Sequence, residues 1–231
     1  MVHTMSSPRN TLYFLFVMFV VLLQGICKVT GRGFFSSSQY NNGQGYKPAP
    51  NCARFECASY VVVHSQKEFE IRKYEKALWV SAPSITMDDY KSAASKGFLI
   101  LFSYYNGNNT EKVKMNLTIP VLIDVKNTSY TVYFRLPKEY QNTMKLVPKP
   151  INKNIQQVTL PKHKFAAVTR YSGNITNKII PVEVAKLNTS LMGTPYQAAA
   201  SAVGFNGYTI AAYNSPFELK NRVNEVLFFY D

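Results

Sequence analysis

The feature that most constrains the fold of this chain is an order of elements, two strands, a helix and two strands, that occurs twice along it. Short apolar runs, or alternation of apolar and polar residues, indicate the strands, and apolar residues at helical spacing indicate the helices. Each copy alone is too small to bury a face of its own sheet. We therefore expect two antiparallel sheets, each backed by a helix, that associate into one domain.

The expected elements have recognisable ends. Thr86 is placed to cap the first helix, and the Asn- and Gly-rich segment 106–109 ends it. The second helix begins near Pro181 and ends before Gly193. The final strand is apolar on both alternating faces, so we expect it to be buried on both sides. A strand at residues 60–63 precedes the first copy. The two copies contain strands at 69–74, 77–82, 115–121, 130–136, 155–160, 164–171, 208–213 and 225–230, with helices at 86–105 and 181–192.

The N-terminal segment indicates export. Residues 12–23 are an uninterrupted apolar run behind Arg9, too short to cross a bilayer core of about 30 Å as a helix. We expect residues 1–31 to be a cleaved signal peptide, with the cut inside 25–33, and the protein to be secreted without a stable membrane span. Residues 32–58 are rich in Gly, Ser, Asn and Pro and predict a flexible arm, followed by a folded domain at 59–231.

Cysteines and glycosylation motifs agree with secretion. Removal of the signal peptide takes away Cys27 and leaves Cys52 and Cys57, which we expect to pair in an oxidising compartment; two free thiols are the alternative. Five N-x-[ST] motifs predict glycosylation sites. Their asparagines are Asn108, Asn116, Asn127, Asn174 and Asn188.

Charge and motifs narrow the function. The chain has a formal net charge of +13 and stays strongly basic after loss of Arg9 and Lys28. Secretion and the lack of a DNA- or RNA-binding motif argue against nucleic acid, so we expect attraction to anionic surfaces or ligand carboxylates instead. There is no G-x-S-x-G, H-E-x-x-H or glycine-rich phosphate loop, so no enzyme class is indicated.

Several short stretches occur in an order and spacing typical of one known family. They are FEIRKY (69–74), LWVS (78–81), KGF (96–98), SYYNGN (103–108), TIPV (118–121), YFRLP (133–137), AYNSP (212–216) and NRVNEV (221–226). Over residues 60–231 the chain resembles the SOUL haem-binding family. The resemblance implies an α+β fold, a distorted antiparallel β-barrel of two pseudo-repeated four-stranded sheets with two flanking helices. It also implies reversible, non-catalytic binding of haem or a related tetrapyrrole, and we expect a monomer.

The chain departs from the family pattern at two places. Asn116 and Leu117 stand where relatives commonly carry Lys-Met, which puts a glycosylation motif in place of a cation. Lys73 stands where some animal relatives carry a His that is a proposed haem ligand. A Lys at its ordinary pKa is protonated and cannot ligate iron.

The resemblance and the residues together predict a groove beside the first helix. Phe98, Leu101, Phe102 and Tyr105 are the candidates for apolar contact with the macrocycle, and Arg72, Lys73 and Lys114 for its propionates. His64 is the preferred candidate iron ligand, ahead of His163. Ordinary core packing of the apolar residues and solvent exposure of the cations and histidines remain alternatives. A module for other small amphiphiles, or a hydrolase, are the competing functions.

Overall fold

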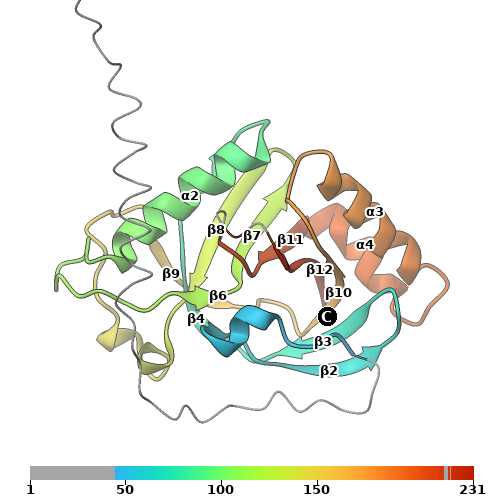
Figure 1. Cartoon of the computed structure of the whole chain (residues 1–231), viewed down its shortest axis with the longest axis horizontal. Coiled ribbons are helices and arrows are strands. Elements are labelled where there is room, and N and C mark those ends of the chain that lie inside the picture. The colour runs from blue at the N-terminus through green and yellow to red at the C-terminus, as the bar shows by residue number, and fades with distance from the viewer. Residues whose placement is uncertain (1–44, 216–217, 219) are drawn as a thin grey trace, which may run out of the picture. The chain divides into compact units, whose positions relative to one another are not determined.

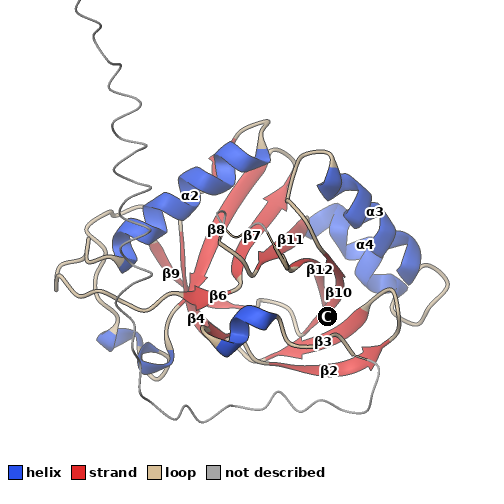
Figure 2. Cartoon of the chain, viewed as in Figure 1, coloured by secondary structure: helices blue, strands red, loops and turns tan. Residues whose placement is uncertain are grey.

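The computed structural model describes residues 45–215, 218 and 220–231. Its dominant feature is a strongly curled antiparallel sheet that forms a half-barrel, with the three long helices on its outer face (Figures 1 and 2). The predicted signal peptide lies outside the described residues. The fold class predicted from the sequence, an α+β distorted barrel, is confirmed.

The sheet runs in one continuous hydrogen-bonded path, with the two-residue strand β5 (Ile85–Thr86) paired to β8 beside it. Along the path the strands are β2 (Tyr60–Ser65), β3 (Glu70–Tyr74), β10 (Phe165–Tyr171), β12 (Asn224–Tyr230), β11 (Tyr208–Ala212), β7 (Val121–Lys126), β8 (Ser129–Arg135), β4 (Ala77–Ser81) and β9 (Gln156–Leu160). The remaining elements are strands β1 (Glu56–Cys57) and β6 (Thr118–Ile119), helices α2 (Tyr90–Tyr105), α3 (Ile179–Leu191) and α4 (Gln197–Asn206), and the 3₁₀ turns η1 (Pro50–Ala53), η2 (Lys138–Tyr140) and η3 (Met144–Leu146).

Apart from the edge strand β2, the strand order is symmetric about the central β11–β7 pair. One side is β11-β12-β10-β3, continued by β2, and the other is β7-β8-β4-β9. The fourth strand on each side comes from the other half of the sequence, since β3 pairs with β10 and β9 pairs with β4. The predicted repeats are therefore visible in the sheet, but they exchange these fourth strands.

The structure differs from the predicted elements at three places. Asp89, not Thr86, is the N-cap of α2, and its side chain accepts a hydrogen bond from Ser92 N at 2.7 Å. The strand expected at 115–121 is divided at Pro120, which has no N–H to donate, into β6 and the longer β7. Helix α4 was not predicted.

The two faces of the sheet are both covered, which explains the apolar character of β12. On the outer face α2 packs over Val132 and Phe134 of β8, and α3 and α4 pack over Phe228 of β12. The inner face, defined by side chains such as Trp79 and Leu227, holds a separate apolar cluster. The expectation that the last strand is buried on both sides is confirmed.

The expectation of a flexible arm up to residue 58 is wrong for residues 45–58. Ala49 is 3% exposed and belongs to the inner-face cluster, and both cysteines pack against that cluster. The predicted disulfide between Cys52 and Cys57 is present, with an S–S distance of 2.02 Å. Strand β1 then pairs with β6. This segment docks because its apolar residues complete the inner face.

Candidate functional site

Helix α2 carries two of the predicted aromatics on a surface that solvent can reach. Phe98 and Phe102 stack with ring centroids 5.6 Å apart and planes 16° from parallel, as side chains four residues apart on a helix can. Phe98 also meets the edge of Phe134 at 5.2 Å. Both are half-buried, and neighbouring Leu99 is 47% exposed. Their outer rims therefore form a small apolar patch on the helix.

Lys114 lies at the end of the same helix. It is exposed and forms an isolated β-bridge with Asn106, the residue that caps α2 one turn beyond Phe102. Phe98, Leu99, Phe102 and Lys114 are called the α2 surface below. This combination of an aromatic patch and a nearby cation can hold a flat, acidic ligand by contact and charge.

Two other predicted contact residues belong to the core. Leu101 and Tyr105 are fully buried beneath α2, and the Tyr105 hydroxyl donates to the Arg135 carbonyl at 2.8 Å. Neither side chain presents an exposed surface to a ligand. For Leu101 and Tyr105, the alternative stated above, ordinary packing in the core, is the one that the structure shows.

Arg72 is not a solvent-facing cation, so the expectation that it meets a propionate fails. Its side chain is fully buried and donates to Glu70 at 2.6 Å and to both carboxylate oxygens of Glu225 at 2.9 Å. Its guanidinium also lies 4.0 Å from the centre of the Tyr60 ring. Its donors serve the interior because Tyr46 of the N-terminal segment covers this part of β3.

Glu225 is the centre of this buried ion cluster. It accepts hydrogen bonds from Arg72, from Arg170 at 2.7 Å and from the Tyr213 hydroxyl at 2.9 Å. Burial opposes its charge, but the attraction of Arg72 and Arg170 outweighs burial and holds the pKa of Glu225 below its ordinary value of 4.5. The cluster is a structural device on the inner face, and Tyr46 of the N-terminal segment closes over it.

The remaining predicted residues lie away from α2. Lys73 is exposed on β3, and His64 on β2 packs against the Tyr196 ring at 4.9 Å. Four strands separate β3 from β8, on which α2 packs. His163 contacts Asp231 at 2.9 Å. The structure therefore does not bring either histidine to the α2 surface.

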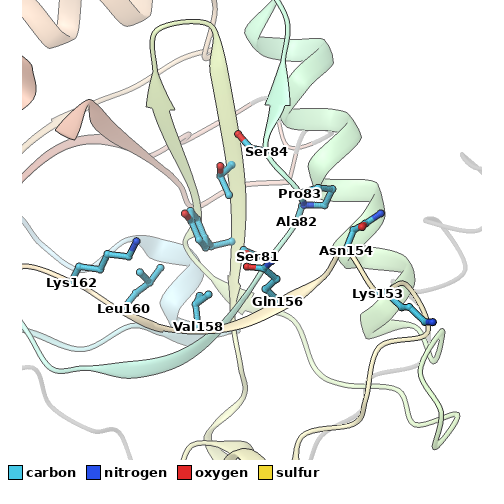
Figure 3. A pocket seen from close by; sticks show the side chains of 12 residues that line it. Ser81, Ala82, Pro83, Ser84, Lys153, Asn154, Gln156, Val158, Leu160 and Lys162 are labelled. Carbon is cyan, nitrogen blue, oxygen red and sulfur yellow. The ribbon is translucent and has the colours of Figure 1, made fainter. Parts of the chain in front are cut away.

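A pocket of about 470 Å³ lies on the inner face of β8, β4 and β9 (Figure 3). Sequence analysis missed it, although the alternation of Gln156, Val158 and Leu160 on the predicted strand marks one of its walls. The lining residues are Ser81, Ala82, Pro83, Ser84, Thr131, Tyr133, Lys153, Asn154, Gln156, Val158, Leu160 and Lys162.

The five predicted glycosylation asparagines are all exposed. Asn127 lies in the turn between β7 and β8, and Asn188 lies on α3. In the described part of the chain, no helix has the length and apolar character needed to cross a membrane. Within the same residues, no three His, Cys, Asp or Glu side chains gather as metal ligands would.

Comparisons with known proteins agree with the sequence resemblance. The family profile described as "SOUL heme-binding protein" matches residues 55–229. Heme-binding protein 2 of Homo sapiens is 26% identical over 170 residues, covering 68% of this chain and 76% of that protein. The Mus musculus protein of the same name is 25% identical over an equally long stretch. Among solved structures, one titled as a hydrolase from Listeria innocua matches with a TM-score of 0.46 and 10% identity, covering 72% of this chain and 94% of that one. On the profile match, which spans most of its length, this chain belongs to the SOUL haem-binding protein family.

Proposed function

We propose that this protein is a secreted, non-catalytic carrier or scavenger that binds haem or a related tetrapyrrole reversibly. The observation that carries the proposal is the family match over residues 55–229, which includes nearly all of the described domain. Its strongly basic composition favours ligands that bear carboxylates, as tetrapyrroles do. Export is supported by the apolar run at 12–23, the disulfide and the exposure of all five glycosylation asparagines.

The α2 surface fits a macrocycle held by its face. The stacked rings of Phe98 and Phe102 present aromatic rims, and Leu99 extends the apolar area. The exposed cation of Lys114 near the end of α2 supports contact with a propionate. Neither histidine of the described residues lies beside this surface, since His64 is on β2 and His163 is between β9 and β10. Binding there depends on apolar contact and charge, without an iron ligand from either histidine, and such binding is reversible.

Haemin titration tests the proposal. Protein recovered from the medium of a secreting eukaryotic culture, with its N-terminus inside 25–33, is titrated while the Soret band is followed. We expect saturable binding of the wild type and about tenfold weaker binding after Phe98→Ala with Phe102→Ala, because aromatic contact area is lost. Lys114→Gln weakens binding less, and Lys91→Gln, at the far end of α2, has no effect.

Two outcomes contradict the proposal. Absence of a saturable Soret change overturns tetrapyrrole binding, and an unchanged affinity in the folded double variant overturns the α2 surface as its site. Phe98→Leu keeps most of the buried volume and guards against a loss caused by misfolding alone. The competing function is a module for other small amphiphiles, and it is favoured because neither His64 nor His163 lies at the α2 surface. That function predicts saturable binding of a fatty acid and no change in the Soret band of haemin.

A further inference from the structure

The pocket on the inner face of β8, β4 and β9 lies on the opposite side of the sheet from the α2 surface. Side chains along a strand point alternately to the two faces. On β8, Phe134 packs beneath α2, whereas its neighbour Tyr133 lines the pocket. A ligand in the pocket is therefore separated from the α2 surface by the sheet itself.

The pocket has an apolar middle and a cation toward each end. Val158 and Leu160 of β9 lie between Lys162 and Lys153 in Figure 3, and both lysines are exposed. Neither lysine forms an ion pair within the part of the chain that the structure describes. Lys162 is attracted to the buried carboxylate of Asp124 on β7. Both ammonium groups are exposed, so an anion that enters the pocket from solvent can also reach them.

The polar lining is neutral or basic. Ser81 is buried at the wall, and Ser84, Asn154 and Gln156 add hydroxyl and amide groups. None of the lining residues is acidic. Asp124, on neighbouring β7, is not part of the lining. It accepts a hydrogen bond from Thr209 at 2.6 Å and also interacts with Tyr133 and Lys162 of the lining. Charge therefore favours an anionic ligand over a cationic one.

We propose that this pocket binds an extended organic dianion, with a carboxylate at each end and an apolar body between them. The volume of about 470 Å³ is in the range of small-molecule sites. The five residues of β9 span roughly 13 to 16 Å at about 3.3 Å per residue, so lysines at its two flanks match acids at the two ends of an elongated molecule. This site is additional to the proposed tetrapyrrole site on α2.

Trp79 provides a local reporter. It is the only tryptophan of the chain, it is 4% exposed, and it packs in the inner-face cluster with Tyr133, Val158 and Leu160. On β4 it pairs directly with Val158 of β9. A ligand that displaces water from the pocket should change its emission.

The test is a tryptophan-fluorescence titration of the full secreted protein with decanedioate. Decanoate and 1,10-decanediol are the matched probes with one acid and none. We expect saturable binding of decanedioate, about threefold to fivefold weaker binding of decanoate and still weaker binding of the diol, because each exposed ion pair contributes a modest free energy. Raising the salt concentration should reduce the differences in affinity among the three probes, because salt screens the charges.

Variants assign the effect to the two lysines. Lys153→Gln and Lys162→Gln should each remove the preference for decanedioate over decanoate, whereas Lys96→Gln, an exposed cation on α2, should leave the preference intact. Equal affinity for dianion and diol, or equal weakening by Lys96→Gln, overturns the proposal. Haemin titration of the same variants separates the two sites: loss of decanedioate binding with an unchanged Soret titration concerns this pocket alone.

Discussion

At the scale of single residues, the buried ion cluster shows how far a charged side chain's role depends on its surroundings. Arg72, Glu70 and Glu225 are completely buried, and together with Arg170 they form a set in which each charge has a partner. Removing Glu225 leaves Arg170 without its carboxylate partner and Arg72 with Glu70 alone, which costs more than the pair contributes. The stability of the protein should therefore be especially sensitive to substitutions in this cluster.

We predict that Glu225→Gln lowers the free energy of unfolding by about 3 to 5 kcal/mol, because Arg72 and Arg170 lose their shared carboxylate. Urea denaturation followed by circular dichroism measures the change. Glu75→Gln, an exposed carboxylate, is the matched control and should change stability by less than about 0.5 kcal/mol. A similar, small loss in both variants would contradict the paired-charge argument.

The same carboxylate predicts a pH dependence of the wild type. The pKa of Glu225 in the folded protein is below its ordinary value of 4.5, because Arg72 and Arg170 outweigh the effect of burial. Its stabilising contribution is complete above that ordinary value and is lost as pH falls through the lower folded pKa. The acid-side loss of stability should therefore be smaller in Glu225→Gln than in the wild type.

At the scale of elements, two helix glycines occupy opposite environments. A Cβ on Gly97 of α2 would lie 2.5 Å from Cγ2 of Val132, so this glycine lets the helix approach β8. A Cβ on Gly204 of α4 would meet nothing within 4 Å. Close packing of α2 therefore depends on the absence of a side chain at Gly97.

We predict opposite effects of the same substitution at these two positions. Gly97→Ala should destabilise the protein by about 1 to 3 kcal/mol through overpacking, and Gly204→Ala should stabilise it by up to about 1 kcal/mol through helix propensity. Thermal unfolding measures both. The double variant Gly97→Ala with Val132→Ala should lose less stability than the sum of the two single losses. Strict additivity of the two losses would contradict a direct contact between positions 97 and 132.

At the scale of the described domain, the N-terminal segment ties the two halves together across the inner face. Glu56 forms an ion pair with Arg135 of β8, and the Asn51 side chain donates to the Tyr213 carbonyl, beyond β11, at 2.9 Å. The disulfide joins Cys52, which follows Asn51, to Cys57, which follows Glu56. The segment therefore acts as an internal strap.

We predict that replacing both cysteines by serine lowers stability by about 2 kcal/mol, since the disulfide closes a short loop. The emission of Trp79 should shift toward that of a more exposed indole, because the docked segment packs in the same cluster. Differential scanning calorimetry and fluorescence give the two readouts. Mild reduction of the wild type should reproduce both changes and leave the double variant unaffected; an unchanged midpoint in both would show that the strap docks without the disulfide.

The candidate site was only partly predictable from sequence. Helical spacing placed Phe98 and Phe102 on one stripe of α2, and both reach the surface. The same spacing could not separate them from Leu101 and Tyr105, because depth in the core depends on how the helix sits on β8. Arg72 was a predicted partner of a propionate, yet its side chain is fully buried by contacts with segments far away in the sequence.

The sequence alone determined the positions of most strands, of α2 and α3, the repeated order, the disulfide and the family, because period, turn residues and motif spacing are local properties of a chain. Only the tertiary structure decided that β3 and β9 cross to the opposite halves, that residues 45–58 dock on the inner face, and that Lys153 and Lys162 flank one pocket. These features arise from pairing between segments far apart in sequence. The free energy gained from such pairing depends on surfaces that form only when the sheet has curled.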